Sequence, residues 1–390
     1  MPALDEFLRP FHVHFARSEA THALERYLTG MFTEHPNKNC DTIAQVVPQT
    51  SEQSLQGLLT AMLWDEDDLN KQRVQQLLTL PTEGDAALIF DDTGFAKQGK
   101  SSVGVARQYS GTLGKVANCQ VTVNCHYAER TIAWPVATRL YLPRKWADDP
   151  QRRKKAKVPD EIAFQTKPQI ALDLLDQADT MGVPYACVVA DADYGDNPNF
   201  LAGLEHRKKR YVVAVRKDFP VALTSNGPAQ AAGAVLAALP VRRWQTIRWR
   251  EGSKGWLTGR FTALRCWRVT ANGKRRAGWL LGEQPARGEQ GKRKYHWSNF
   301  RAAAPLDQLV EYAHRRWGVE KFHEESKGLL GWDQYQGRLW TGFHRNSVLV
   351  MLAYSFLTQQ EWQGRQRVSR RGRKRRPFSP SARPQACVAG

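Results

Sequence analysis

The chain has 390 residues, enough for one large domain or about two to three smaller ones. Its 57 Lys and Arg against 38 Asp and Glu give a net charge of +19, which favours a polyanionic partner, either nucleic acid or an anionic membrane. The cysteines form no C-x-x-C pair, no apolar run reaches about 18 residues, and the N-terminus lacks a signal-peptide pattern. We therefore predict no zinc site and no membrane insertion, and we expect a cytoplasmic protein.

Residues 1–80 have the apolar periodicity of helices. Within them, residues 42–62 form two periodic segments separated at Pro48, and Thr50 and Gln53 have the spacing of a capping box for the second segment. A helix-turn-helix has this pattern, and so does an ordinary helical hairpin. The basic composition favours a DNA-binding role for this N-terminal region.

Residues 81–217 have a definite order of elements. We predict strands at 87–90, 119–127 and 131–142, a helix at 165–182, a strand at 185–191, a helix at 198–209 and a strand at 210–216. Neighbouring strands followed by strand–helix alternation predict an α/β fold, a mixed sheet with flanking helices. An RNase H-like core has this order.

The remainder of the chain divides into three parts. Short, Trp-rich basic segments at 218–305 predict a β-rich insertion. Helical patterns at 306–330 and 346–357 predict that residues 306–362 form the C-terminal helices of the core. Residues 363–390 form a basic tail with eight cations between 365 and 376 and no acid there, and we expect this tail to be disordered in isolation.

Residues 94–101, "GFAKQGKS", match the phosphate-binding pattern of ATPases at every fixed position. Such a loop must follow its strand directly and open a helix. Here Asp91, Asp92 and Thr93 stand between strand and loop, and Gly104 and Gly111 interrupt the segment that should be helical. A β-hairpin or loop is the better prediction, with a P-loop ATPase as the alternative.

Acidic residues occur in three separate segments: "IFDDTG" (89–94), "VVADADYG" (188–195) and "RRWGVEKFHEESK" (315–327). Two or three carboxylates can hold Mg²⁺ and leave positions open for water and phosphate oxygens. Two such ions about 3.5 to 4 Å apart can promote displacement at a phosphodiester. Convergent acids in a basic protein therefore indicate phosphodiester chemistry.

The first two of these segments resemble those of bacterial insertion-sequence transposases of the RNase H-like DDE class. The resemblance covers most of residues 80–360. It implies that the first acid is the Asp that directly precedes Thr93, which is Asp92, and that the second is Asp191, after an apolar run and an alanine. Asp193 falls where that family has no ligand.

The third segment resembles the subgroup whose catalytic helix carries a Tyr, Arg, Glu, Lys signature. Arg316, Glu320 and Lys327 have the family spacing, whereas Ala313 stands where the tyrosine is expected and Tyr312 lies one residue early. On one helix, an arc of about 80° would contain a set of five side chains. They are Tyr312, Arg316, Glu320, His323 and Lys327.

The resemblance implies a transposase that cuts and joins DNA at the ends of its own element. Two Mg²⁺ ions, with Mn²⁺ able to substitute, would be held by Asp92, Asp191 and Glu320. The partners would be double-stranded DNA, at terminal inverted repeats and target, and a second copy of the chain, in the bacterial nucleoid. A catalytically inactive DNA-binding derivative is the other alternative. The expected DNA contacts are Arg316, Lys327, Tyr312, His323, Arg107, Lys115 and Trp256.

Overall fold

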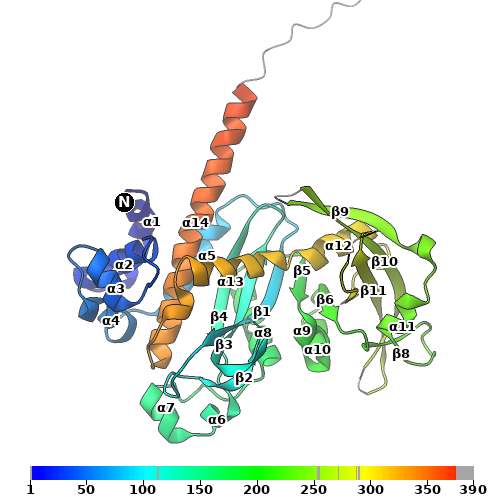
Figure 1. Cartoon of the computed structure of the whole chain (residues 1–390), viewed down its shortest axis with the longest axis horizontal. Helices are drawn as coiled ribbons and strands as arrows, with labels where there is room; N and C mark the ends of the chain where they lie inside the picture. Colours follow the sequence, from blue (N-terminus) through cyan, green and yellow to red (C-terminus); the bar gives the residue numbers. More distant parts are fainter. Residues whose placement is uncertain are drawn as a thin grey trace, which may run out of the picture.

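A computed structural model describes residues 2–111, 114–252, 255–270, 272–286, 288 and 290–374. Its N-terminal part is helical, as predicted (Figure 1). Helices α3 and α4 are separated around Pro48, as expected. The N-cap of α4 is Ser51 and not Thr50: Ser51 Oγ accepts from Ser54 N at 3.2 Å, whereas the Thr50 hydroxyl donates to Pro48 O. The helices are α1 (Pro2–Leu8), η1 (Arg9–His14), α2 (Ser18–Met31), α3 (Cys40–Val46), α4 (Glu52–Thr60) and α5 (Glu66–Leu78).

The described residues form one 12-stranded mixed sheet, ordered β2-β3-β1-β5-β6-β12-β11-β10-β7-β8, with β4 on β3 and β9 on β10. Strands β1, β5 and β6 are parallel, and β3 is antiparallel to β1. The fold is therefore the predicted α/β arrangement, consistent with an RNase H-like core. The strands are β1 (Ala87–Ala96), β2 (Ala106–Ser110), β3 (Lys115–Ala128), β4 (Ala133–Leu140), β5 (Cys187–Ala190), β6 (Tyr211–Val215), β7 (Pro220–Ala222), β8 (Gln230–Ala231), β9 (Gln245–Gly252), β10 (Gly255–Val269), β11 (Arg275–Pro285) and β12 (Lys294–Ser298).

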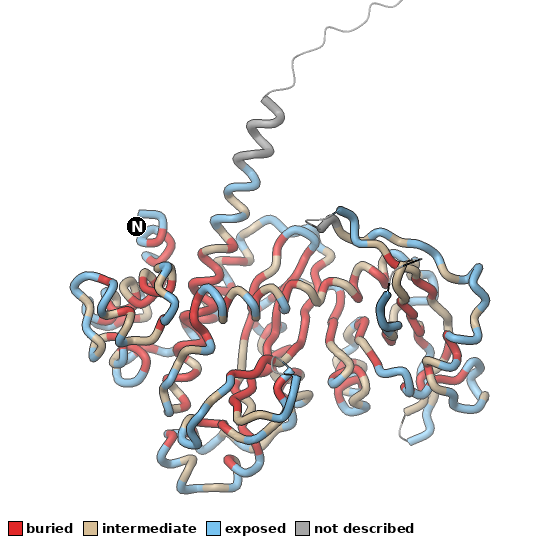
Figure 2. Tube along the Cα trace, in the orientation of Figure 1, coloured by how far each residue is buried: buried red, intermediate tan, exposed pale blue. Residues whose placement is uncertain are grey.

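The segment at 218–305 is rich in strands, as predicted, and it extends the central sheet. Strand β12 pairs antiparallel with β6, and β11 and β10 follow outward. Figure 2 shows the central strands largely buried and the outer β9 strand largely exposed. The insertion is thus joined to the rest of the sheet by continuous backbone hydrogen bonding.

The two faces of β1 pack against different helices. Leu88 and Phe90 share a core with Leu174 of α8, whereas Ile89 shares a core with Val319 of α13. Successive strand residues point to opposite faces, so the parity of a position decides which helix it meets. Figure 1 shows α12 and α13 running across one face of the sheet. The helices after β4 are α6 (Arg144–Ala147), α7 (Pro150–Ala156), α8 (Lys167–Thr180), α9 (Ala192–Gly195), α10 (Pro198–His206), α11 (Ala232–Ala237), η3 (Val241–Arg243), α12 (Leu306–His314), α13 (Trp317–Gly328), η4 (Trp332–Gln334) and α14 (Trp340–Lys374).

The helix predicted over 306–330 is two helices, α12 and α13, with a break at Arg315 and Arg316. Arg315 is only 3% exposed, and its guanidinium holds the break by donating to Asp85 Oδ2 at 2.5 Å and to Glu311 Oε1 at 2.9 Å. Because of the break, residues before and after it do not share one helical face.

The C-terminal helix is longer than predicted. Helix α14 spans 35 residues and projects from the body of the molecule in Figure 1. The predicted tail at 363–390 therefore begins inside a helix, and residues 375–390 lie outside the described residues. Among the residues that the structure describes, no helix has the length and apolar character needed to cross a membrane.

Candidate active site

Two aspartates lie at the same level of adjacent parallel strands. Phe90 of β1 pairs with Ala190 of β5, so the next residues, Asp91 and Asp191, follow aligned positions. Asp191 directly follows β5 and caps α9, its Oδ1 accepting from Asp193 N at 3.0 Å. Asp91 continues β1 on the face that α13 covers. The parallel pairing thus brings together two acids that are 100 residues apart in the chain.

Arg316 connects this strand edge to α13. Its Nη1 donates to Asp91 Oδ2 at 2.6 Å, and its Nη2 donates to Glu320 Oε1 one turn along the helix. The negative charge of Asp191 also acts on Arg316 and favours its protonated form, as do Asp91 and Glu320; together they raise the Arg316 pKa although burial opposes them. The acids of β1, β5 and α13 therefore surround one guanidinium.

Asp92 does not occupy the position expected from the sequence. Its carboxylate lies on the opposite face of β1, where it forms an ion pair with Lys167 of α8 and accepts from Tyr194 Oη at 3.0 Å. Asp92 still lines the same cavity as Asp191 and Glu320, but Asp91, the adjacent residue on the other face of β1, is the acid that Arg316 connects to Glu320.

A cavity of about 630 Å³ opens at this edge of the sheet. Lys327 enters it from α13 and donates to Thr93 Oγ1 at 2.5 Å and to Gly94 O at 2.9 Å. His323 accepts from Asn124 Nδ2 at 3.1 Å. The wall is completed by Asp91, Asp92, Tyr109, Ser110, Gly111, Val121, Asp191, Ala192, Asp193, Arg316, Glu320 and Glu324.

Asp91 and Asp191 have raised pKa values. Burial raises the pKa of Asp91 to about 8, with Asp191 and Asp92 adding to the shift and Arg316 opposing it. Burial, followed by the charges of Asp92 and Asp193, raises the pKa of Asp191 to about 6. Buried carboxylates that repel one another need a cation nearby to be ionised together. This is the electrostatic character of a cation-binding site.

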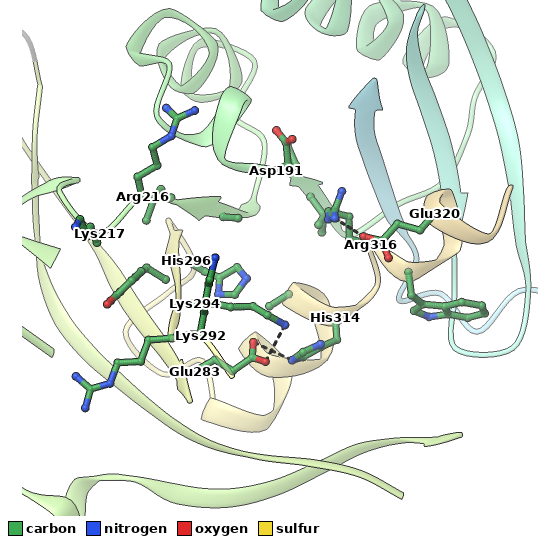
Figure 3. Close-up of a pocket in the computed structure, with 18 of the residues that line it drawn as sticks. Asp191, Arg216, Lys217, Glu283, Lys292, Lys294, His296, His314, Arg316 and Glu320 are labelled. Atoms are coloured by element: carbon green, nitrogen blue, oxygen red, sulfur yellow. Dashed lines mark hydrogen bonds and ion pairs between the residues drawn. The ribbon is translucent and has the colours of Figure 1, made fainter. Parts of the chain in front are cut away.

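A second cavity, of about 810 Å³, meets the first at Asp191, Arg316 and Glu320 (Figure 3). Its far wall comes from the insertion. Glu283 of β11 accepts from Lys294 Nζ at 3.0 Å and lies 3.3 Å from His314 Nε2. The cations that line this cavity besides Arg316 are Arg216, Lys217, Lys292, Arg293 and Lys294. The acidic centre thus faces a positively charged surface that a polyanion would contact.

Three residues predicted to contact DNA, Arg107, Lys115 and Trp256, are exposed but line neither cavity. Arg107 and Lys115 lie on paired strands β2 and β3, so the segment after β1 is the hairpin that the glycines predicted. Trp256 begins β10 and is 56% exposed.

Tyr312 lies in the core beneath the sheet. It is 4% exposed, its ring lies 5.4 Å from that of Phe300, and it lines neither cavity. The helix break at Arg315 and Arg316 separates it from the face that carries Glu320 and Lys327. The sequence-based expectation of one shared groove for all five residues is therefore wrong for Tyr312.

The residue types fit a divalent cation, although the described side chains are not arranged around one. Among the described residues, no three His, Cys, Asp or Glu side chains form a group that could hold a metal ion. Arg316 already bonds two of the carboxylates concerned. Carboxylate oxygens are the ligands that Mg²⁺ prefers. The residues therefore supply suitable ligand atoms, but a cation can bind Asp91 and Glu320 together only if Arg316 moves away from them.

The P-loop alternative is wrong. Strand β1 extends through Gly94 to Ala96, so the matching residues begin inside a strand, and the next described helix is α6 at Arg144–Ala147. In the part of the chain that the structure describes, strand β2 follows the motif where a phosphate loop would open a helix.

Sequence reasoning missed Lys167, Asn124 and the contact of Asp91 with Arg316. Lys167 and Asn124 lie outside the three acidic segments of the chain and carry no local signal. Asp91 stands next to Asp92 in the sequence, but the sequence does not say which of the two lies on the face of β1 that packs against α13. Tyr194, which bonds Asp92, was part of the second motif without a predicted role.

Two family models and one curated relative match this chain. The model of the DDE superfamily endonuclease matches residues 10–256, and the model of the transposase DDE domain matches residues 166–356. The chain is 24% identical over 347 residues to a probable transposase for insertion sequence element IS701 from Microchaete diplosiphon, a match that covers 85% of this chain and 81% of that protein.

Among solved structures, the C-terminal lobe of a budding yeast Argonaute is similar at 10% identity and a TM-score of 0.22, over 78% of this chain and 54% of that one. A similarity of this strength carries no argument about the fold. The endonuclease model matches more than half of the chain, and the transposase relative covers most of it. The chain therefore belongs to the DDE superfamily of endonucleases, among its insertion-sequence transposases.

Proposed function

We propose that this transposase uses Asp91, Asp191 and Glu320 as its three catalytic acids when it cuts DNA at the ends of its element and joins them to target DNA. One observation carries this assignment. Asp91 and Asp191 follow aligned positions of adjacent parallel strands, and Glu320 comes from the helix that covers the Asp91 face. Asp92 faces α8, where Lys167 neutralises it.

The acids are suited to hold two divalent cations, which we propose to be Mg²⁺ with Mn²⁺ able to substitute. When bound, such ions activate the attacking oxygen and stabilise the leaving oxygen of a phosphodiester. The reaction has two stages. Water first hydrolyses the bond at the element end, and the freed 3′-hydroxyl then attacks a phosphodiester of target DNA, releasing one strand end for each bond formed.

The basic groups of the site position the DNA. Lys327 and Arg316 are placed to bind phosphates on either side of the scissile bond, Arg316 as a bidentate partner. Burial, together with the charges of Lys327 and Arg316, lowers the pKa of His323 to about 3, so it stays neutral near Asn124 and supports the helix rather than pairing with phosphate. Arg107, Lys115 and Trp256 are exposed and available for contacts outside the cut.

We further propose that two copies of the chain act together in the bacterial nucleoid. The substrate of such an element has two ends of matching sequence, and a homodimer can present one acidic centre to each end. The cationic wall at Lys292 and Lys294 gives each copy a surface for the DNA that leads away from its acids.

The test is cleavage of duplex DNA that contains the element's terminal repeat and genomic flank. Purified protein with Mg²⁺ is expected to nick at the repeat boundary, and mapping the cut ends on a denaturing gel locates the bond. Asp91→Asn should abolish nicking while DNA binding persists. Binding without any nicking by the wild-type protein would instead identify a catalytically inactive derivative.

A further inference from the structure

Arg316 occupies the space between two of the three catalytic acids. Its Nη1 bonds Asp91 on β1, and its Nη2 bonds Glu320 on α13. The Asp91 side chain is 11% exposed and that of Arg316 is 31% exposed, so the pair with Asp91 is largely shielded from water. One side chain thus connects the strand and the helix that must both supply metal ligands.

A guanidinium and a divalent cation compete for these oxygens. The guanidinium presents N–H donors in a fixed fork, and each donor that bonds a carboxylate oxygen removes a lone pair from coordination. Mg²⁺ accepts only a near-octahedral set of oxygens at short distances. While Arg316 lies between Asp91 and Glu320, these two carboxylates cannot hold one ion together.

A DNA phosphate is an alternative partner for the Arg316 guanidinium. Phosphate oxygens accept bidentate bonds from guanidinium as carboxylates do. Arg316 also stands where the two cavities meet, and one of these is lined by Arg216, Lys292 and Lys294, which attract a polyanion. DNA that enters along this surface arrives beside Arg316.

We propose that Arg316 is an internal cation that keeps the catalytic acids closed to metal until a DNA phosphate draws it away. The inference rests on the proposed role of Asp91 and Glu320 as ligands. Metal and DNA then bind cooperatively, since each favours the state in which Arg316 has left the acids. By thermodynamic reciprocity, metal raises the affinity for DNA by the same factor. The enzyme therefore binds its metal ions mainly when DNA is already bound.

Lys327 provides a matched control in the same cavity. It comes from the same helix, and its Nζ donates to Thr93 Oγ1 and to Gly94 O, which are neutral oxygens. Removing its charge changes the cavity's electrostatics by the same single unit. It does not open the Asp91–Glu320 pair.

The experiment is a Mn²⁺ titration of the full-length protein without DNA, followed by electron paramagnetic resonance of free Mn²⁺. Arg316→Gln should bind Mn²⁺ about 10-fold or more tightly than wild type, within the usual range of coupling between sites. Lys327→Gln should stay within about 2-fold to 3-fold of wild type, the size of a nonspecific charge effect. Arg316→Lys, which lacks the fork, should be intermediate.

A second titration adds a short duplex in which the leaving 3′-oxygen of the scissile phosphate is replaced by a methylene group, a charged linkage that hydrolysis cannot break. The duplex should tighten Mn²⁺ binding to wild type and leave Arg316→Gln nearly unchanged. Thermal melting checks that each variant is folded. A folded Arg316→Gln that binds Mn²⁺ no better than wild type, or no better than Lys327→Gln, overturns the proposal.

The outcome separates this inference from the proposed function. If Mn²⁺ binds with equal affinity to wild type and Arg316→Gln, and Asp91→Asn weakens both, the acids hold metal and only the role of Arg316 fails. If Asp91→Asn and Glu320→Gln leave Mn²⁺ binding unchanged in every background, the assignment of the metal ligands fails and the inference fails with it.

Discussion

Arg316 Nη1 lies 2.6 Å from Asp91 Oδ2, on the face of β1 that α13 covers, while the adjacent Asp92 is paired with Lys167 on the other face. A shift of one residue along a strand therefore changes which helix a carboxylate meets. The catalytic assignment of this enzyme depends on that parity, and it can be tested with conservative amide substitutions.

Asp91→Asn is expected to reduce DNA nicking by about 100-fold or more, since loss of a ligand costs at least as much as loss of a group that supports one. Asp92→Asn should retain measurable nicking, because its carboxylate bonds Lys167 and Tyr194 instead of facing Glu320. Initial rates on a labelled duplex, with binding measured in parallel by fluorescence anisotropy, compare the two. Loss of nicking in Asp92→Asn with activity in Asp91→Asn would reverse the assignment.

Glu320→Gln should likewise abolish nicking, whereas Glu324→Gln should remain within about 10-fold of wild type, as expected for a neighbouring side chain that supports but does not ligate. Both residues line the same cavity from the same helix, but only Glu320 accepts from Arg316. The pair therefore separates ligation from a general loss of negative charge. An inactive Glu324→Gln beside an active Glu320→Gln would mean that the other acid of α13 is the ligand.

Lys327 should make DNA binding depend on pH. Burial lowers the pKa of Lys327 to about 8, against the smaller opposing effect of Asp333. Phosphate binds the protonated form of Lys327. The affinity for DNA should therefore fall as pH rises through about 8, where Lys327 loses its proton in the protein without DNA. Anisotropy titrations at pH 7 and pH 9 should show this decline in wild type. Lys327→Met should bind more weakly at pH 7 and lack the additional decline.

Glu283 should make folding stability depend on pH in the acid range. Burial raises its pKa, but the hydrogen bond and charge of His314 and the charge of Lys294 outweigh burial and lower the pKa to about 2. Since the folded pKa lies below the unfolded one, the stabilisation is complete above about pH 4.3 and disappears as pH falls toward 2.

Glu283→Gln should therefore be less stable than wild type at pH 6 by on the order of 3 kcal/mol, and the difference should shrink between pH 4 and pH 2. Urea unfolding at several pH values measures it. A difference that stays constant across this range would show that packing, and not the charge of Glu283, is responsible.

Trp256→Ala should weaken DNA binding without affecting the fold. The side chain is 56% exposed at the start of β10, so its loss removes little packing. An exposed indole that stacks on a base contributes roughly 1 to 3 kcal/mol. Leu257→Ala, at a neighbouring 38% exposed position, is the control for a nonspecific effect on the hairpin. Equal affinity of wild type and Trp256→Ala for the terminal-repeat duplex would remove Trp256 from the interface.

The sequence by itself determined the order of strands and helices, the three acidic segments and the family. These features follow from local properties: apolar periodicity marks the strands at 87–90 and 185–191, and the spacing from Arg316 through Glu320 to Lys327 lies within one helix. It also argued against a phosphate loop, because Gly104 and Gly111 are unsuitable for the helix that such a loop must open, but only the extension of β1 to Ala96 removed that alternative. Each of these inferences needs no contact between distant residues.

Only the tertiary structure decided which acids meet. The choice between Asp91 and Asp92 depends on which face of β1 packs against α13, and no local pattern contains that information. The break at Arg315, which removes Tyr312 from the groove, is held by Asp85, 230 residues earlier in the chain. Lys167 finds Asp92 only because α8 packs on the opposite face of the sheet. Packing between segments that are distant in the sequence, rather than residue type, therefore determines which partner each charged side chain contacts.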